Sequence, residues 1–274
     1  MSTLLSTPLP SESSATQVLA TVLLRKPNTC PFIRWHLQEK FEVMEKLFRK
    51  YLSPGTRFID MACGTGDALA LAALCQPQCE LWGLDIYPPD LQVASTRTNA
   101  ILVEGNMLDP QVPKGSFDIV HEFGAAYLIA GWDTLARTYF SLLRDGGILL
   151  WELPQKWSLE HISYLLSAAP KITAQDTKIK RLYRSLFPSK YSFQSDLNVA
   201  EALQATGCNY EIVEKIPISH FYCRGLVCKL MDFSWRFGGD GLFAWVDKTT
   251  SKVWPRYAGY YLVIRKNGPV SRVN

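Results

Sequence analysis

The sequence lacks the compositional extremes that mark nucleic-acid-binding or membrane-spanning proteins. Of its 274 residues, 47% are hydrophobic and 20% are charged, and the formal net charge is only +4. A positive excess this small does not indicate nucleic acid as a partner, so any basic site must be local. The composition instead fits one large globular domain, or one domain with a cap.

A long apolar run and a targeting signal are also missing. The apolar stretch 18–24 is far shorter than the roughly 20 residues with which a helix spans a membrane. Residues 1–15 are rich in Ser, Thr and Pro and have neither a basic start nor an apolar core. We therefore expect a disordered lead followed by a short helix, in a cytoplasmic protein without a membrane partner.

Cysteine occurs without a metal-binding pattern. The seven cysteines are scattered, and Cys75 and Cys79 have helical spacing but no second pair or histidine to complete a metal site. We therefore predict reduced thiols and no bound metal.

The apolar periodicity predicts an α/β protein. Short apolar runs predict strands at 58–61, 80–86, 100–104, 117–122 and 147–153. Apolar residues at helical spacing predict helices at 32–51, 67–74, 90–97 and 133–143. Strands that alternate with helices form βαβ units, which indicates a parallel sheet.

The pattern changes after Pro154. Residues 155–190 have a helical pattern, a further helix is predicted at 196–206, and two strands at 210–217 and 257–266 enclose an aromatic stretch. We predict a Rossmann-like, doubly wound sheet of seven strands, mostly parallel, with a C-terminal antiparallel hairpin. The predicted division of the chain is a tail with cap helices at 1–52, a cofactor-binding core at 53–154, a helical cap insertion at 155–206, and C-terminal strands at 207–274 with an aromatic insertion at 218–256.

A glycine turn after the first strand is the main candidate for a binding site. Asp60 ends that strand, Gly64 and Gly66 form the turn, and Asp85 ends the next strand. In a doubly wound sheet an acid at this place accepts hydrogen bonds from ribose hydroxyls. The third glycine of the dinucleotide motif and the Gly-Lys-Ser/Thr of a phosphate loop are both absent. The charges of Asp60 and Asp67 would also repel a pyrophosphate, so a cofactor with a positive centre fits better.

Residues 57–153 resemble the class I S-adenosylmethionine-dependent methyltransferases of the small-molecule type. Five segments in order carry the resemblance: Asp60-x-x-x-Gly64-x-Gly66, Leu84-Asp85, Gly105-Asn106-Met107, Ser116-Phe117-Asp118-Ile119-Val120 and Leu143-Arg-Asp-Gly-Gly147-x-Leu149-Leu150. The family more often has Asp at the position of Asn106, and Asn can still accept from the adenine amine.

The resemblance implies that S-adenosylmethionine is the cofactor, and it assigns residues to it. Ala62, Gly64 and Gly66 would hold the methionyl part with their backbone, and Asp60 would lie near its amine. Asp85 would bind the ribose, and Ile86 would pack on the adenine. The remaining expected contacts of the cofactor are Asn106, Met107 and His121.

The acceptor site is expected beyond the fourth strand. His121 and Glu122 are the catalytic candidates, although each can equally be a hydrogen-bonded strand-end residue. Side chains alternate along a strand, so at most one of the two points straight at the pocket. The candidates for substrate binding are Tyr127, Arg181, Tyr222 and Trp235. Arg181 belongs to a basic run at 171–190 that is more often a solvated helix face.

The resulting interpretation is an enzyme that methylates a small organic or peptide-derived acceptor, by O-methylation of a carboxylate or another oxygen in natural-product metabolism. Two alternatives remain: N-methylation of a small amine, and a methyltransferase fold that binds the cofactor without methyl transfer. A nucleic-acid acceptor is disfavoured because residues 121–124, His-Glu-Phe-Gly, stand where an Asn-Pro-Pro-aromatic motif would be. The sequence does not fix the oligomeric state.

Overall fold

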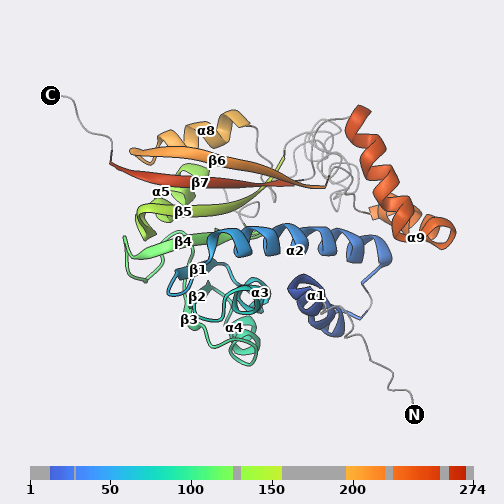
Figure 1. Cartoon of the computed structure of the whole chain (residues 1–274), viewed down its shortest axis with the longest axis horizontal. Coiled ribbons are helices and arrows are strands. Elements are labelled where there is room, and N and C mark those ends of the chain that lie inside the picture. Colours follow the sequence, from blue (N-terminus) through green and yellow to red (C-terminus); the bar gives the residue numbers. More distant parts are fainter. Residues whose placement is uncertain are drawn as a thin grey trace, which may run out of the picture.

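The computed structural model describes residues 13–27, 29–125, 131–155, 196–219, 225–253 and 259–269. Its strands are β1 (Arg57–Met61), β2 (Glu80–Asp85), β3 (Ile101–Glu104), β4 (Phe117–Glu122), β5 (Leu143–Pro154), β6 (Cys208–Ser219) and β7 (Gly259–Pro269). They form one sheet in the order β3-β2-β1-β4-β5-β7-β6 (Figure 1). The first five strands pair in parallel, and β7 is antiparallel to both β5 and β6. The predicted fold class, a mostly parallel seven-stranded sheet with an antiparallel C-terminal pair, is confirmed.

Helices cover both faces of the sheet. The helices are α1 (Ser14–Arg25), α2 (Pro31–Tyr51), α3 (Asp67–Cys75), α4 (Pro88–Ser95), α5 (Trp132–Leu142), α8 (Asp196–Gln204) and α9 (Gly225–Val253). Alternation along β1 sends Phe58 into the core beneath α1, α2 and α3, and Ile59 into the core beneath α5 and α8. The central strands are therefore buried on both sides, which is why they read as apolar runs in the sequence.

The predicted elements differ from the structure mainly at their ends. The helix expected from residue 90 begins at Pro88, because a proline in the first turn has no N–H to lose. The short N-terminal helix is α1, which begins after Ser13, whose hydroxyl accepts from the N–H of Thr16. The helical pattern at 155–190 lies outside the described residues except for Gln155.

The aromatic stretch between the last two strands is largely a helix. It forms α9, which is interrupted at Gly239, where φ is +55°. Phe243 anchors α9 because its fully buried ring packs on Phe32 and Trp35 of α2, at centroid distances of 5.1 and 5.9 Å. Among the described residues, no helix is both long and apolar enough to cross a membrane.

Candidate functional site

The turn after β1 has an unusual backbone. Ala62, Gly64 and Gly66 all have positive φ, at 59°, 50° and 76°. A Cβ added at Gly66 would lie 3.0 Å from the Cβ of Ala94, so glycine is needed there for α4 to pack. At Gly64 the nearest atom would be 4.0 Å away. The turn is therefore packed at Gly66 and open at Gly64, which leaves its backbone accessible to a ligand.

Asp85 holds this turn in place from the end of β2. Its carboxylate accepts from the N–H of Gly64 at 2.8 Å and from the N–H of Tyr87 at 2.9 Å. The residue is only 8% exposed. Each carboxylate oxygen has further acceptor capacity, so ribose hydroxyls can be bound without breaking these two bonds.

Two apolar side chains next to Asp85 are exposed. Ile86 is 69% exposed and Tyr87 is 57% exposed, which is a surface that a flat apolar ring can cover. Asn106, at the end of the neighbouring strand, is also exposed, but its Oδ1 already accepts from the N–H of Leu108 at 2.9 Å. Met107 is buried in the core. Together with the open glycine turn, this surface fits a ribose and adenine.

His121 lies inside the protein. It is fully buried, its Nδ1 is 2.7 Å from Oδ1 of Asp60, and its Nε2 is 3.3 Å from the hydroxyl of Tyr261. Its ring also stacks near Phe58 and meets Phe48 edge-on. Burial raises the pKa of Asp60, and His121 opposes that shift. This geometry favours the alternative of a hydrogen-bonded strand-end residue that positions Asp60.

Glu122 is buried on the other face of β4. Its Oε1 accepts from the N–H of Ala125 at 2.6 Å. Burial first, and then the charge of Glu122, raise the pKa of Tyr139 in α5 well above its usual value. Within the described residues Glu122 thus fixes the loop after β4, close to where an acceptor was expected.

Of the candidates for acceptor binding, one lies in the described part of the chain. Trp235 is in α9, 39% exposed, and its indole N–H donates to Oδ1 of Asp240 at 3.1 Å. Tyr127, Arg181 and Tyr222 lie outside the described residues.

Asp67 has partners that sequence reasoning missed. Arg25 of α1 and Arg97, which follows α4, reach Oδ1 of Asp67 at 2.5 and 2.6 Å. Arg97 also donates to the carbonyl of Thr65 at 2.6 Å. We expected the charge of Asp67 to repel a phosphate. That argument was wrong for Asp67, because the guanidinium groups of Arg25 and Arg97 neutralise its charge. The arginine in the last turn of α1 was the available sequence signal.

Another ion pair that is largely shielded from solvent lies at the end of β5. Nζ of Lys40 in α2 is 2.5 Å from Oε1 of Glu152, and the two side chains are 20% and 7% exposed. Lys40 also lies 5.1 Å from the ring centroid of Phe123. Oε2 of Glu152 is buried and has no hydrogen-bond partner among the described residues. The pair joins α2 to the carboxyl edge of the sheet, and its members are too far apart in sequence to be matched by pattern.

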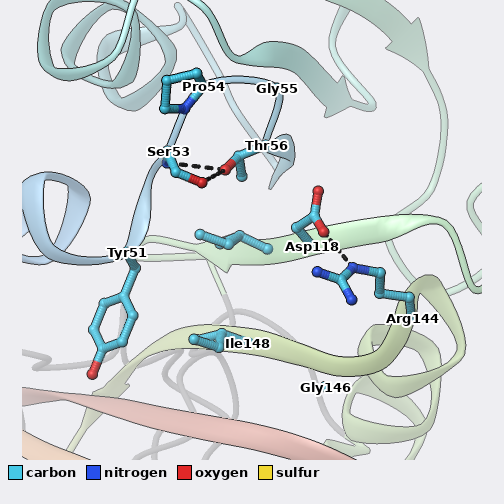
Figure 2. A pocket seen from close by; sticks show the side chains of 10 residues that line it. Tyr51, Ser53, Pro54, Gly55, Thr56, Asp118, Arg144, Gly146 and Ile148 are labelled. Atoms are coloured by element: carbon cyan, nitrogen blue, oxygen red, sulfur yellow. Dashed lines mark hydrogen bonds and ion pairs between the residues drawn. The ribbon is translucent and has the colours of Figure 1, made fainter.

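A separate cavity of about 320 Å³ lies at the opposite edge, where β4 and β5 begin (Figure 2). Figure 2 shows Asp118 and Arg144 directed toward one another there, and they form an ion pair. Asp118 also accepts from the backbone N–H of Arg57 at 2.7 Å. Its carboxylate is thus used to join β1, β4 and β5, which supports a structural role.

Comparison with curated proteins finds methyltransferases. The chain matches a family model described as a methyltransferase domain over residues 52–201. It is 33% identical over 128 residues to a demethylmenaquinone methyltransferase of Geobacillus kaustophilus, covering 44% of this chain and 53% of that protein. It is 27% identical over 127 residues to a trans-aconitate 2-methyltransferase of Methylobacterium radiotolerans, covering 46% and 49%. The match therefore spans about half the length of these relatives.

Solved structures share the fold. An S-adenosylmethionine-dependent methyltransferase from Mesorhizobium loti aligns with a TM-score of 0.52 at 16% identity, covering 80% of this chain and 96% of that one. A possible histamine N-methyltransferase from Thermotoga maritima aligns with a TM-score of 0.52 at 13% identity, covering 91% and 98%. The family model matches more than half of the chain, so the chain belongs to the methyltransferase-domain family. This confirms the family of S-adenosylmethionine-dependent methyltransferases that the sequence motifs predict.

Proposed function

We propose that this protein is a cytoplasmic methyltransferase that O-methylates a small organic or peptide-derived carboxylate in natural-product metabolism. The observation that carries the cofactor half of the proposal is the carboxylate of Asp85, which holds the open glycine turn beside an exposed apolar surface. When bound, S-adenosylmethionine supplies an electrophilic methyl group on a sulfonium.

The residues around the turn each bind a different part of the cofactor. The backbone at Gly64 approaches the methionyl part, and Asp60, oriented by His121, accepts from its amine. Asp85 binds the ribose hydroxyls, while Ile86 covers one side of the adenine. These contacts fix the cofactor by position, and alignment with the acceptor is the main requirement of an in-line displacement.

The choice of a carboxylate rests on the state of the two catalytic candidates. His121 and Glu122 are both fully buried and hydrogen-bonded. A carboxylate needs no general base, because its pKa near 4 leaves it ionised at neutral pH. The name of one relative, trans-aconitate 2-methyltransferase, also points to a carboxylate.

A second candidate acceptor is a quinone, because several relatives are named demethylmenaquinone methyltransferases. N-methylation of an amine is a third possibility that the sequence left open. The chemical stability of the product separates these acceptors.

The test uses the full chain with methyl-labelled S-adenosylmethionine and a metabolite extract. The carboxylate proposal predicts a labelled product that releases methanol in mild alkali, because esters hydrolyse while ethers, amines and C-methyl groups do not. Activity should stay nearly flat between about pH 6 and pH 8. The matched control is Asp85→Ala, which should lose activity through the cofactor. An alkali-stable product would exclude the carboxylate, and cofactor binding without any labelled product would exclude methyl transfer.

A further inference from the structure

Helix α9 carries an unusual share of exposed apolar side chains. Of the large apolar residues that are exposed in the described part of the chain, α9 contributes Phe233, Trp235, Phe237, Trp245 and Val253. Phe237 is 79% exposed and Trp245 is 63% exposed. A gathering of aromatic rings in water on one helix usually marks an interaction surface.

The second half of α9 has a defined orientation. Its buried Phe243 faces α2, and successive helical residues turn by about 100°. Trp245, Lys248 and Lys252 are therefore roughly 140–200° away from Phe243, on the side of the helix turned away from α2. All three are exposed. We call these three residues the outer face of α9.

Charges of opposite sign are segregated across the second half of α9. Asp247 lies roughly 40° from Phe243, so it points toward α2. Its charge acts on Glu39 of α2, whose pKa is raised by burial first and by Glu42 and Asp247 after that. The acid thus faces inward, and the outer face is left with a tryptophan and two lysines.

The first half of α9 repeats the combination of aromatic and basic residues. The rings of Phe233 and Phe237 are 5.6 Å apart, and the guanidinium of Arg236 lies 6.0 Å from the centroid of Phe233. All three side chains are exposed. The acid at the kink, Asp240, accepts from the indole of Trp235.

The position of α9 connects this surface to the site. The helix joins the end of β6 to the start of β7, which is the edge of the sheet where the parallel strands end. Figure 1 shows α9 beyond that end of the sheet, beside the first turns of α2. In open α/β sheets ligands bind at this edge.

We propose that the outer face of α9 docks on the surface of an anionic lipid bilayer, with the Phe233–Arg236–Phe237 cluster extending the contact beyond the kink. Tryptophan and phenylalanine partition into the interfacial layer of a bilayer, and flanking lysines bind anionic headgroups. A second copy of the chain fits less well, because a symmetric contact would bring the lysines of both copies together. Docking would hold the cofactor edge of the sheet near the lipid headgroups.

Vesicle flotation of the full chain tests this proposal. The wild type should float with vesicles of equimolar phosphatidylcholine and phosphatidylserine, and much less with phosphatidylcholine alone. The double variant Lys248→Glu/Lys252→Glu should weaken binding by about fivefold or more for each changed lysine. Trp245→Ala should weaken it by about tenfold. The matched controls are Lys114→Glu, an exposed lysine at the opposite edge of the sheet, and Ile212→Ala, an exposed residue of β6 that is 52% exposed.

Several results would overturn the proposal. One is a wild type that floats with neither kind of vesicle, and another is a set of α9 variants that binds as well as the controls. A third is concentration-dependent dimerisation that Trp245→Ala abolishes, because the face would then join two copies of the chain. The variants should bind S-adenosylhomocysteine normally, so a loss of flotation is distinguishable from a misfolded site.

Discussion

At the scale of single residues, the candidate site depends on side chains that hold the fold and that we propose to bind the ligand as well. Asp85 closes the glycine turn through two backbone N–H groups, and the same carboxylate is the expected ribose acceptor. The carboxylate of Asp60 is held by the ring of His121, and it is the expected acceptor for the amine of the cofactor. A substitution at such a residue therefore changes the loop as well as the contact, and the experiment must separate the two effects.

His121 offers a direct test of positioning against proton transfer. His121→Ala should leave the buried carboxylate of Asp60 without its partner. We expect the cofactor to lose about 1–3 kcal/mol of binding free energy, which weakens its binding about 5- to 150-fold. Turnover at saturating cofactor should change much less. Calorimetric titration with S-adenosylhomocysteine and turnover assays measure the two quantities.

The control for this variant is Tyr261→Phe, which removes the hydroxyl near Nε2 and leaves the bond to Asp60 intact. Its cofactor affinity should stay close to that of the wild type. A general base would behave differently: turnover would fall about 10²–10⁴-fold in His121→Ala while cofactor affinity stayed unchanged.

At the scale of elements, the N-terminal helices are attached through buried charges. Glu45 of α2 accepts from the N–H of Ala15 at 3.0 Å and from that of Ser14 at 3.3 Å, so it caps the start of α1. Arg49 donates to the same carboxylate. At the other end of α1, Arg25 binds Asp67 beside the glycine turn. Helix α1 is thus tied to the start of α3, directly after the glycine turn.

The attachment of α1 should depend on pH. Burial would raise the pKa of Glu45, but the hydrogen bonds from Ala15 and Arg49 outweigh it, and the pKa lies below the ordinary value of 4.5. The unfolded chain then binds the proton more readily, so this stabilisation is present above about pH 4.5 and is lost as the pH falls through the lowered value. Glu45→Gln should reduce the free energy of unfolding by about 1.5–3 kcal/mol at neutral pH.

Urea unfolding between about pH 7 and pH 3 measures this difference, because the stabilisation is lost below about pH 4.5. The gap between wild type and Glu45→Gln should narrow toward the acid end. Glu42→Gln is the matched control, since Glu42 accepts from Gln38 within the same helix and caps no other helix in the described part of the chain. A gap that stays constant with pH would show that the charge of Glu45 does not hold α1.

The pair of Lys40 and Glu152 attaches α2 to β5. Lys40→Met should reduce the free energy of unfolding by about 3–5 kcal/mol, because it leaves a carboxylate that is 7% exposed without its cation. Adding Glu152→Gln should recover much of that loss. Chemical denaturation measures both variants, with Arg265→Met as the control, because its exposed pair with Glu211 contributes at most about 1 kcal/mol. A double variant no more stable than Lys40→Met would contradict this account.

The elements differ in how well the sequence predicts them. The central parallel strands β1, β2, β4 and β5 were predictable because each is an apolar run with buried side chains on both faces. Helix α9 was not, because Gly238, Gly239 and Gly241 interrupt its pattern and read as turns. The buried pairs were also missed, since His121 and Asp60 lie on different strands and Lys40 and Glu152 are 112 positions apart. Only the assembled sheet brings such residues together.

At the scale of the whole molecule, the strand order brings the loops after β1, β2 and β3 to one edge of the sheet. The segments 62–66, 85–87 and 105–107 meet at that edge although other elements separate them in the chain. The cavity at the opposite edge holds the pair of Asp118 and Arg144, and its described lining includes no residue of the candidate site. The two edges therefore provide matched positions for testing ligand binding against stability.

Ligand-induced stabilisation uses these two edges. S-adenosylhomocysteine at about 100 times its Kd should stabilise the wild type by about 2.7 kcal/mol, which raises Tm by about 5–10 °C for a chain of this size. Asp85→Asn should show about half that shift or less at the same concentration, because the loss of charged hydrogen bonds raises Kd by about tenfold or more. Asp118→Asn should lower Tm without ligand but keep the full shift, since its carboxylate joins strands at the far edge. Differential scanning fluorimetry measures all three proteins.

Two outcomes would contradict this account. Equal shifts in wild type and Asp85→Asn would show that the ribose is bound elsewhere. A lost shift in Asp118→Asn would show that the two edges of the sheet are coupled.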